Sequence, residues 1–155
     1  MAMSVAAGAL TATTASANEM IEVRVGAVLA SNSGQEIDPR LVSMNRQLRA
    51  LFPYTSYRLV KESHRQVMCG GKIGFDIPGG RYLLVMPKGI KNERVSLRVM
   101  LIEGTRPVVD TALTLRNHAT FLVGGPRHEH GVLIITIGAD ALPASADANY
   151  PTATE

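Results

Sequence analysis

The 155-residue chain has no tryptophan and a single cysteine, Cys69, and none of its apolar runs approaches the roughly 18 residues of a membrane-spanning helix. One cysteine excludes an intrachain disulfide, and the length suffices for one domain that buries a core without such cross-links. No nucleophile with its base and no paired acids can be recognised. The Gly-rich segments 78–80 and 124–126 lack the Lys-Ser/Thr pair of a phosphate-binding loop. We therefore expect a non-enzymatic protein that uses no cofactor.

Strand-like segments with turn residues between them account for most of the chain. Apolar and polar side chains alternate in most of these segments, which is the period of a strand with one buried face. The segments are 21–29, 54–61 with a continuation or a separate short strand at 65–68, 73–77, 82–86, 95–102, 109–115, 121–123 and 132–137. The regular turn spacing predicts a mainly β fold, an antiparallel β-sandwich or small barrel of about eight strands.

The run 132–137 does not alternate between apolar and polar residues. It reads Val-Leu-Ile-Ile-Thr-Ile, so apolar side chains point to both faces of the strand. A strand that is buried on both faces lies in the centre of a sheet or beneath a helix. We expect 95–102 and 109–115 to flank it or pair with it as antiparallel neighbours, with Arg98 and Arg116 in solvent.

One helix is predicted, at about 38–52. Asp38 is a favourable residue for capping free backbone amides, and Pro39 is tolerated at the first helical position. Phe52 precedes Pro53 and is therefore biased out of helical conformation, which ends the helix. The apolar residues recur at spacings of three and four and should pack against a sheet. They are Leu41, Met44, Leu48 and Leu51.

The ends of the chain differ in composition from its middle. Residues 1–17 contain no charge, and Ala15-Ser16-Ala17 has the small-x-small pattern of a signal-peptidase site, although the positive segment of a signal peptide is missing. We interpret 1–17 as a clipped signal segment; an uncharged leader of an intracellular protein is the alternative. Residues 18–140 then form a single β-rich domain, and 141–155 form a flexible or extended tail. A periplasmic or secreted protein is expected.

The charge is concentrated in the middle of the chain. All 16 basic residues lie between Arg24 and Arg127 together with seven acids, so this interval carries a net charge of +9. A dense part of it predicts a basic face with aromatic side chains. This face consists of Arg40, Arg46, Arg49, Tyr57, Arg58, Lys61 and Arg65. It suits an anionic glycan or lipid head group, and a solvated surface is the alternative. Nucleic acid is not expected, because no RNA-binding motif is present.

Histidine and cysteine supply the remaining candidates for chemistry. His128 and His130 are two positions apart, so on a strand both would point to one face and could bind a metal together. They follow the turn-like segment 124–126, and a solvated hairpin tip explains them equally well. Cys69 has only His64 near it in the sequence, so we expect a buried structural thiol.

Residues 108–139 contain a strand, a polar turn, an apolar segment that ends in two glycines, and a final apolar strand. The residues concerned are Thr111-Ala112-Leu113-Thr114-Leu115, Asn117-His118-Ala119-Thr120, Phe121-Leu122-Val123-Gly124-Gly125 and Leu133-Ile134-Ile135. This pattern resembles the β-hairpin in the core of bacterial outer-membrane secretins, with Asn117-His118 in place of the usual Asp-Gly and Pro126 after the two glycines. The resemblance implies a small envelope β-protein, an accessory to a secretion or pilus-like machine, and transfers no functional residue.

These features lead to a principal hypothesis and a rival. The first is an exported, non-enzymatic β-domain that works by protein–protein contact in a cell-envelope assembly, with an envelope protein or by self-association. It predicts a concentrated apolar or Arg-rich patch on one sheet or along an edge strand. The rival is a binding module for an anionic glycan or lipid head group that uses the basic face. Neither requires a transmembrane span.

Overall fold

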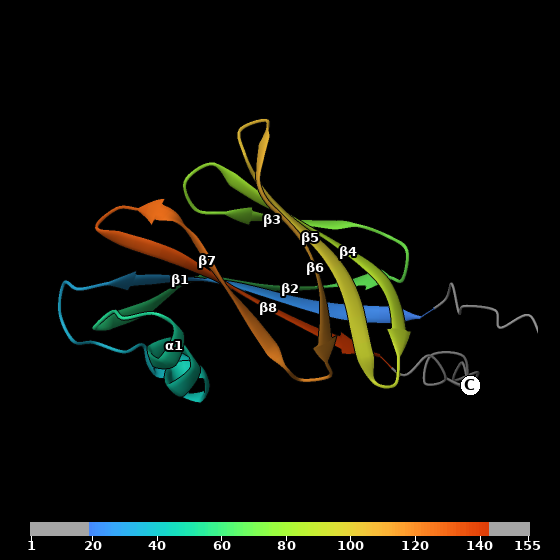
Figure 1. Cartoon of the computed structure of the whole chain (residues 1–155), viewed down its shortest axis with the longest axis horizontal. Coiled ribbons are helices and arrows are strands. Elements are labelled where there is room, and N and C mark those ends of the chain that lie inside the picture. Colours follow the sequence, from blue (N-terminus) through green and yellow to red (C-terminus); the bar gives the residue numbers. More distant parts are fainter. Residues whose placement is uncertain (1–18, 143–155) are drawn as a thin grey trace, which may run out of the picture.

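The computed structural model describes residues 19–142, which form two antiparallel four-stranded sheets and a short helical segment (Figure 1). The sheets pack face to face and do not close into a barrel, so the described part of the chain is an eight-stranded sandwich. This confirms the predicted mainly β fold and decides between the two predicted architectures. The predicted leader at 1–17 and most of the predicted tail at 141–155 lie outside the described residues.

The strand order differs between the two sheets: sheet B follows the order of the chain, and sheet A joins its first two strands to its last two. Sheet A has the order β2-β1-β8-β7, and sheet B has the order β3-β4-β5-β6. The strands of sheet A are β1 (Met20–Ser31), β2 (Ser56–Met68), β7 (Thr120–His128) and β8 (Gly131–Ala141). The strands of sheet B are β3 (Ile73–Ile77), β4 (Arg81–Lys91), β5 (Arg94–Glu103) and β6 (Arg106–Arg116).

Strand β8 lies inside sheet A, as its apolar sequence predicts, and every residue from 133 to 139 is buried. Its neighbours, however, are β1 and β7. The expectation that 95–102 and 109–115 flank it or pair with it is wrong. These segments are β5 and β6, which pair with each other in sheet B. The chain passes from sheet B to sheet A at Asn117–Ala119, so the run of strands that looks continuous in the sequence is divided between two layers.

The main core lies between the two sheets. It is made of the side chains that alternate inward from both layers, which is why most strands show a period of two. Sheet A contributes the inward residues of β1 and β8, and sheet B those of β3, β4 and β5. The fully buried members with the largest side chains are Ile21, Leu83, Leu97, Leu101, Leu133, Ile135 and Ile137.

A second, smaller core lies on the outer face of sheet A, beneath the helical segment (Figure 1). This segment begins with a 3-10 helix, η1 (Pro39–Met44), and continues as α1 (Asn45–Leu51). The predicted helix at 38–52 is thus present in two parts. The residues of the second core are Val28, Ala30, Leu41, Leu48, Tyr57, Leu59, Leu122 and Ile134. Ile134 explains why β8 needs apolar residues on both faces.

Three of the four predicted contact residues of the helix face sheet A. Leu41 and Leu48 are fully buried, and Met44 is partly buried against the second core. The prediction for Leu51 is wrong, since 58% of it is exposed. The helix ends at this residue because Phe52 is extended, with φ −131° and ψ 119°, as the following proline favours. Phe52 therefore packs against the second core in place of Leu51.

Candidate protein-contact surface

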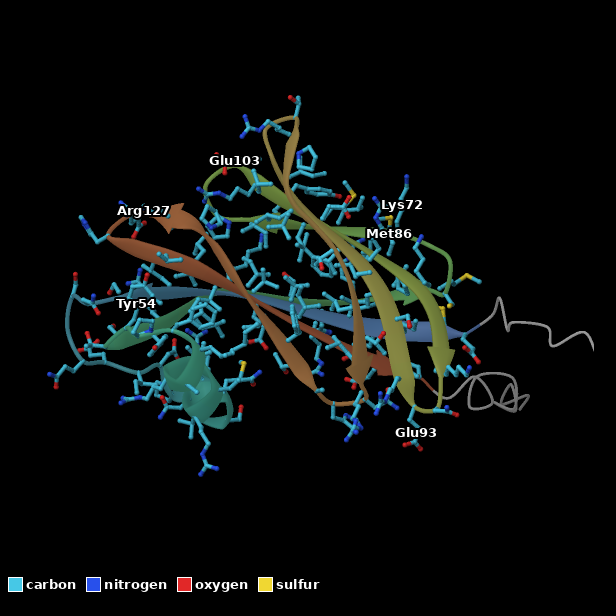
Figure 2. The ribbon with its side chains drawn as sticks, viewed as in Figure 1. Tyr54, Lys72, Met86, Glu93, Glu103 and Arg127 are labelled. Carbon is cyan, nitrogen blue, oxygen red and sulfur yellow. The ribbon has the colours of Figure 1, made fainter. Side chains whose placement is uncertain are left out.

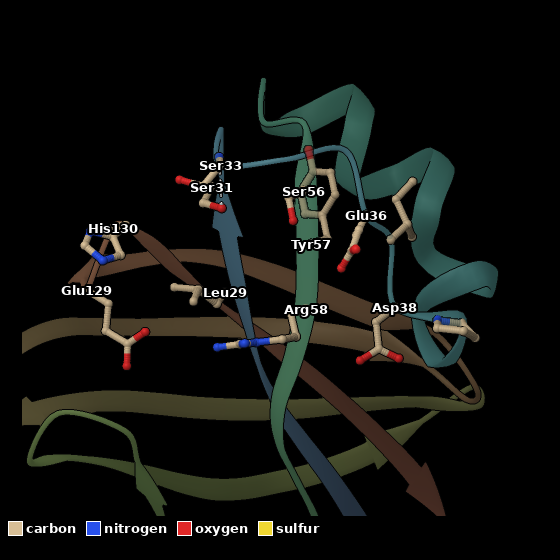
Figure 3. A pocket seen from close by; sticks show the side chains of 12 residues that line it. Leu29, Ser31, Ser33, Glu36, Asp38, Ser56, Tyr57, Arg58, Glu129 and His130 are labelled. Atoms are coloured by element: carbon tan, nitrogen blue, oxygen red, sulfur yellow. Dashed lines mark hydrogen bonds between the residues drawn. The ribbon is translucent and has the colours of Figure 1, made fainter.

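A recess lies at one end of sheet A, where the loop after β1, the start of β2 and the turn between β7 and β8 meet (Figure 3). Its volume is about 650 Å³, and it is open to solvent. Glu36, Asp38 and Glu129 bring three carboxylates to its wall, against the guanidinium of Arg58 and the imidazole of His130. This balance of charge does not suit an anionic ligand.

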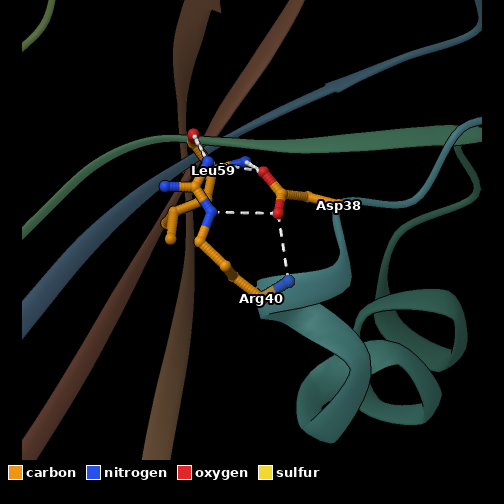
Figure 4. A network of polar contacts seen from close by, with 3 residues as sticks. All are labelled: Asp38, Arg40 and Leu59. Atoms are coloured by element: carbon orange, nitrogen blue, oxygen red, sulfur yellow. Dashed lines mark hydrogen bonds and ion pairs between the residues drawn. The ribbon is translucent and has the colours of Figure 1, made fainter.

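One of these carboxylates is occupied by the network in Figure 4. Asp38 accepts hydrogen bonds from the backbone N–H, Nε and Nη2 of Arg40 at 3.0, 3.0 and 2.7 Å, and from the backbone N–H of Leu59 at 3.3 Å. These bonds, first of all those from the Arg40 side chain, hold the pKa of Asp38 well below its usual range. Arg40 also donates to the Leu59 carbonyl at 3.1 Å. The pair therefore fixes the helical segment to β2.

The predicted basic face is divided between different parts of the molecule. Arg46 and Arg49 lie exposed on α1, at the outer face of sheet A. Arg58, Lys61 and Arg65 lie opposite inward residues of β1, so they are on the face of β2 that is turned away from α1. A bulge at Val60 shifts the register and brings Arg58 onto the same face as Lys61. The cations of the predicted face therefore do not form one surface.

Several of the predicted contact residues already have partners within the chain. Arg49 Nε donates to Asn45 Oδ1 at 2.9 Å, and Arg65 Nη1 donates to the Gly74 carbonyl at 3.1 Å, which links β2 to β3. Tyr57 is only 1% exposed, and its hydroxyl donates to the Phe52 carbonyl. The prediction of Tyr57 as an aromatic support for a ligand is wrong, because its ring belongs to the second core.

The histidines and the cysteine lie on different strands and turns. His128 is the last residue of β7, and His130 lies in the turn before β8, so the two do not occupy alternate positions of one strand. Within residues 19–142 no group of three or more His, Cys, Asp or Glu side chains is arranged to hold a metal ion. Cys69 is partly buried, and burial raises the pKa of its thiol.

The outer face of sheet B carries an apolar surface that the sequence reading did not locate. We call it the sheet B face and define it by Tyr82, Leu84, Met86, Met100, Ile102 and Ala112. The strand register places Tyr82 opposite Ile102 and Leu84 opposite Met100, so these side chains adjoin across β4 and β5. Tyr82 is 42% exposed, and the other members are half-buried or exposed. Among the described residues, no helix packs on this face.

A pair of opposite charges adjoins the apolar residues of the sheet B face. Arg98 lies beside Met86 and Ala112 in the register, and it donates from Nε and Nη2 to Asp110 at 3.1 and 2.8 Å. The hydrogen bond from Arg98 lowers the pKa of Asp110. Lys72 and Met86, labelled in Figure 2, lie on the side of the molecule away from α1. An apolar centre with a charged rim is the usual composition of a protein-contact surface.

A sequence signal for this surface exists. Residues 82–86 and 99–102 are apolar at nearly every position, as 132–137 are. In β8 the outward apolar residue, Ile134, is covered by the helical segment. In β4 and β5 the outward residues Leu84, Met100 and Ile102 keep part of their surface exposed. In the predicted strand 95–102, Met100 and Ile102 occupy the outward positions, and alternation alone does not explain why they are apolar.

No helix within residues 19–142 is long and apolar enough to cross a membrane. Comparisons with known proteins supply no relative from which a function can be transferred: no family model, no curated protein and no solved structure matches the chain.

Proposed function

We propose that this chain is an exported, non-enzymatic β-sandwich domain that works by protein–protein contact in a cell-envelope assembly, and that the sheet B face is its contact surface. The observation that carries the proposal is the apolar outer surface of β4 and β5. Partly exposed large apolar side chains that adjoin one another are typical of interaction sites, whereas scattered ones are not. Here four of them, Tyr82, Leu84, Met100 and Ile102, form two adjacent cross-strand pairs.

The composition of the sheet B face supports a protein partner. Tyrosine and methionine are enriched in contact surfaces, because they bring large apolar area and, for methionine, an adaptable shape. Tyr82 also covers Gly74 on the neighbouring strand, where an added Cβ would overlap its hydroxyl. The hydroxyl end of the ring therefore lies over Gly74 of β3. Arg98 and Asp110 at the rim supply both signs of charge for orienting it.

The location in the cell envelope rests on the amino-terminal sequence. The uncharged segment 1–17 with its Ala15-Ser16-Ala17 pattern supports export, and the likeness of 108–139 to a secretin hairpin supports an envelope setting. The rival function, binding of an anionic glycan or lipid, has less support. Its cations lie on different faces of sheet A, and Arg40 and Arg65 are held by partners within the chain.

Site-specific photo-crosslinking in cells that produce the protein naturally tests the proposal. A photoreactive amino acid at Met100 should give discrete adducts with envelope proteins or with a second copy. The matched control is the same amino acid at Arg46, which is exposed on α1, and it should give few. Adding Leu84→Lys to the Met100 probe should remove the adducts while the melting temperature stays close to that of the parent. Equal labelling from both positions, or none from Met100 in a folded protein, would contradict the proposed function.

A further inference from the structure

The four edge strands of the sandwich differ in how they are protected against pairing with another chain. Edge strands expose unpaired N–H and C=O groups, and proteins usually block them with bulges, prolines, short length or covering segments. Strand β2 has a bulge at Val60, and a short bridge from Ile37 to Tyr57 covers its start. Strand β3 has only five residues, and Arg65 donates to its Gly74 carbonyl.

Strand β7 is protected in the same manner, whereas most of β6 is not. A bulge interrupts β7 between Gly124 and Arg127, where Pro126 lies, and Gln47 donates to the Thr120 carbonyl at 3.2 Å. Strand β6 has its bulge near its beginning, and it pairs regularly with β5 over residues 109–116. That stretch contains no proline and no lysine. Residues 109–116 are therefore a long regular edge without a blocking feature, and in the described part of the chain residues 61–68 of β2, which begin with a lysine, form the other regular stretch of this length.

The hydrogen-bond alternation shows which groups of β6 face this open edge. The Asn117 N–H donates to the Glu93 carbonyl at 3.2 Å, so the odd-numbered residues of β6 direct their backbone groups toward β5. The even-numbered residues, 110 to 116, direct theirs outward. The Arg116 carbonyl points outward in the same way, because it accepts a hydrogen bond at 3.1 Å from the Ala119 N–H, which lies outside the sheet.

We infer that β6 pairs with β6 of a second copy of this chain, antiparallel and centred on Leu113. This inference rests on the proposed function and names the first partner of the contact domain. In a two-fold antiparallel pair, residues that face each other must point to the same side of the sheet, so only registers that match even with even are allowed. Among them, the register centred on Leu113 places Asp110 opposite Arg116 of the partner, twice.

Charge complementarity favours this register over its neighbours. Arg116 lies opposite Arg94 within sheet B, and both are exposed, so two like charges adjoin on one face. A carboxylate from a second copy would lie beside these two guanidinium groups and reduce their repulsion. Shifting the centre to Ala112 would place Asp110 opposite Thr114, and shifting it to Thr114 would place Arg116 opposite Ala112. Neither register pairs the opposite charges.

Pairing through β6 would also extend the contact surface. The two-fold axis of an antiparallel edge pair is perpendicular to the sheet, so both sheet B faces point to the same side. The result is one eight-stranded sheet with the two apolar faces joined. The hydrogen-bonded pairs would be 110 with 116 and 112 with 114. The two-fold axis repeats each of them, so four pairs with two main-chain bonds each give about eight bonds. The dimer then presents twice the apolar area to a further partner.

The first test is sedimentation of the purified full-length chain over a range of concentrations. The parent should form a dimer. Asp110→Arg and Arg116→Asp, made separately, should each weaken it at least tenfold, and the double exchange should restore it to within about threefold. Arg106→Asp, the same kind of change in the same strand outside the paired register, is the control and should have little effect. A parent that stays monomeric at all concentrations would overturn the inference, and so would single variants that dimerise like the parent.

The second test reads the register directly and does not depend on charge. In a Cys69→Ser background, Leu113→Cys would place two thiols across the axis, at the Cα distance of about 4.5 Å expected for this kind of pair, which allows a disulfide. Oxidation by copper phenanthroline should cross-link Leu113→Cys and leave Thr111→Cys monomeric. If both cross-link equally, or neither does, the register is wrong.

The two proposals can fail separately. A monomeric chain whose Met100 probe still labels an envelope protein would overturn the β6 dimer and keep the proposed function. A chain that dimerises only after truncation at 142 would show that its own tail occupies β6, which also overturns the inference for the full-length protein. A β6 dimer without any labelling from Met100 would leave the inference standing as simple self-association and remove support for the sheet B face as a contact surface.

Discussion

Leu48→Ala is expected to destabilise the protein by about 2–3 kcal/mol, because Leu48 joins the helical segment to sheet A. Its side chain is fully buried in the second core, with Leu41 above the sheet and Tyr57 and Ile134 within it. Replacing a buried leucine by alanine costs about 2–5 kcal/mol, depending on how well the site can collapse. The short helical segment can settle toward the sheet, and alanine favours helix, so the lower half of this range applies.

Urea denaturation measures this change as a lower midpoint with an unchanged slope. For a domain of this size the same loss lowers the melting temperature by roughly 6–15 °C. Leu51→Ala is the matched control, because it makes the same substitution one turn later in the same helix at a residue that is 58% exposed. It should change stability by no more than about 0.5 kcal/mol. If Leu48→Ala melts like the parent, or both variants lose the same amount, the helix does not pack on sheet A as described.

Two further substitutions and one hydrogen-exchange measurement test other parts of the fold. Tyr57→Phe removes the hydroxyl that donates to the Phe52 carbonyl and should cost about 1 kcal/mol in urea denaturation; no loss would mean that this bond is not formed in solution. The lowered pKa of Asp38 stabilises the fold above the ordinary value of 3.8, and this contribution declines as the pH falls below it. Asp38→Asn should therefore flatten the acid side of the stability profile, and an unchanged profile would refute the network's role. Because β8 is a central strand and β6 is an edge strand, the backbone amides of 132–137 should exchange with solvent more slowly than those of 110–116. The reverse order of exchange rates would exclude a central position for β8.

The elements of the fold could be predicted because they depend on local patterns. Alternation of apolar and polar residues identifies a strand with one buried face, and the lack of alternation at 132–137 identifies a strand that is covered on both. The pattern says nothing about which strand lies beside which. Residues 109–115 alternate as they would in either sheet, so their pairing with β5 and not with β8 could not be deduced. The passage of the chain from sheet B to sheet A at Asn117–Ala119 puts β6 and β8 in different layers.

The candidate site was less predictable because it depends on what covers each face. The cations between Arg40 and Arg65 are close in sequence, yet Arg46 and Arg49 lie on α1 at the outer face of sheet A, whereas the bulge at Val60 places Arg58, Lys61 and Arg65 together on the opposite face of β2. The sheet B face shows the reverse case, because its residues are distant in the sequence and close in the structure. Leu84 and Met100 are 16 positions apart and meet only because the strand register places them opposite each other. Apolar residues on both faces of β4 and β5 were visible from the start, but not whether a helix would cover them.

The sequence by itself determined the strands, the helical segment and most of the predicted buried residues, because these follow from periodicities of two and of three to four residues along one chain. Tertiary structure decided the partition of the strands into two sheets, the covering of β8 by the helix, and the exposure of the sheet B face and of the β6 edge. The physical reason is that burial of a strand's second face depends on distant segments, and only one helical segment is available in the described chain. It covers sheet A, so the apolar outer residues of sheet B keep part of their surface exposed.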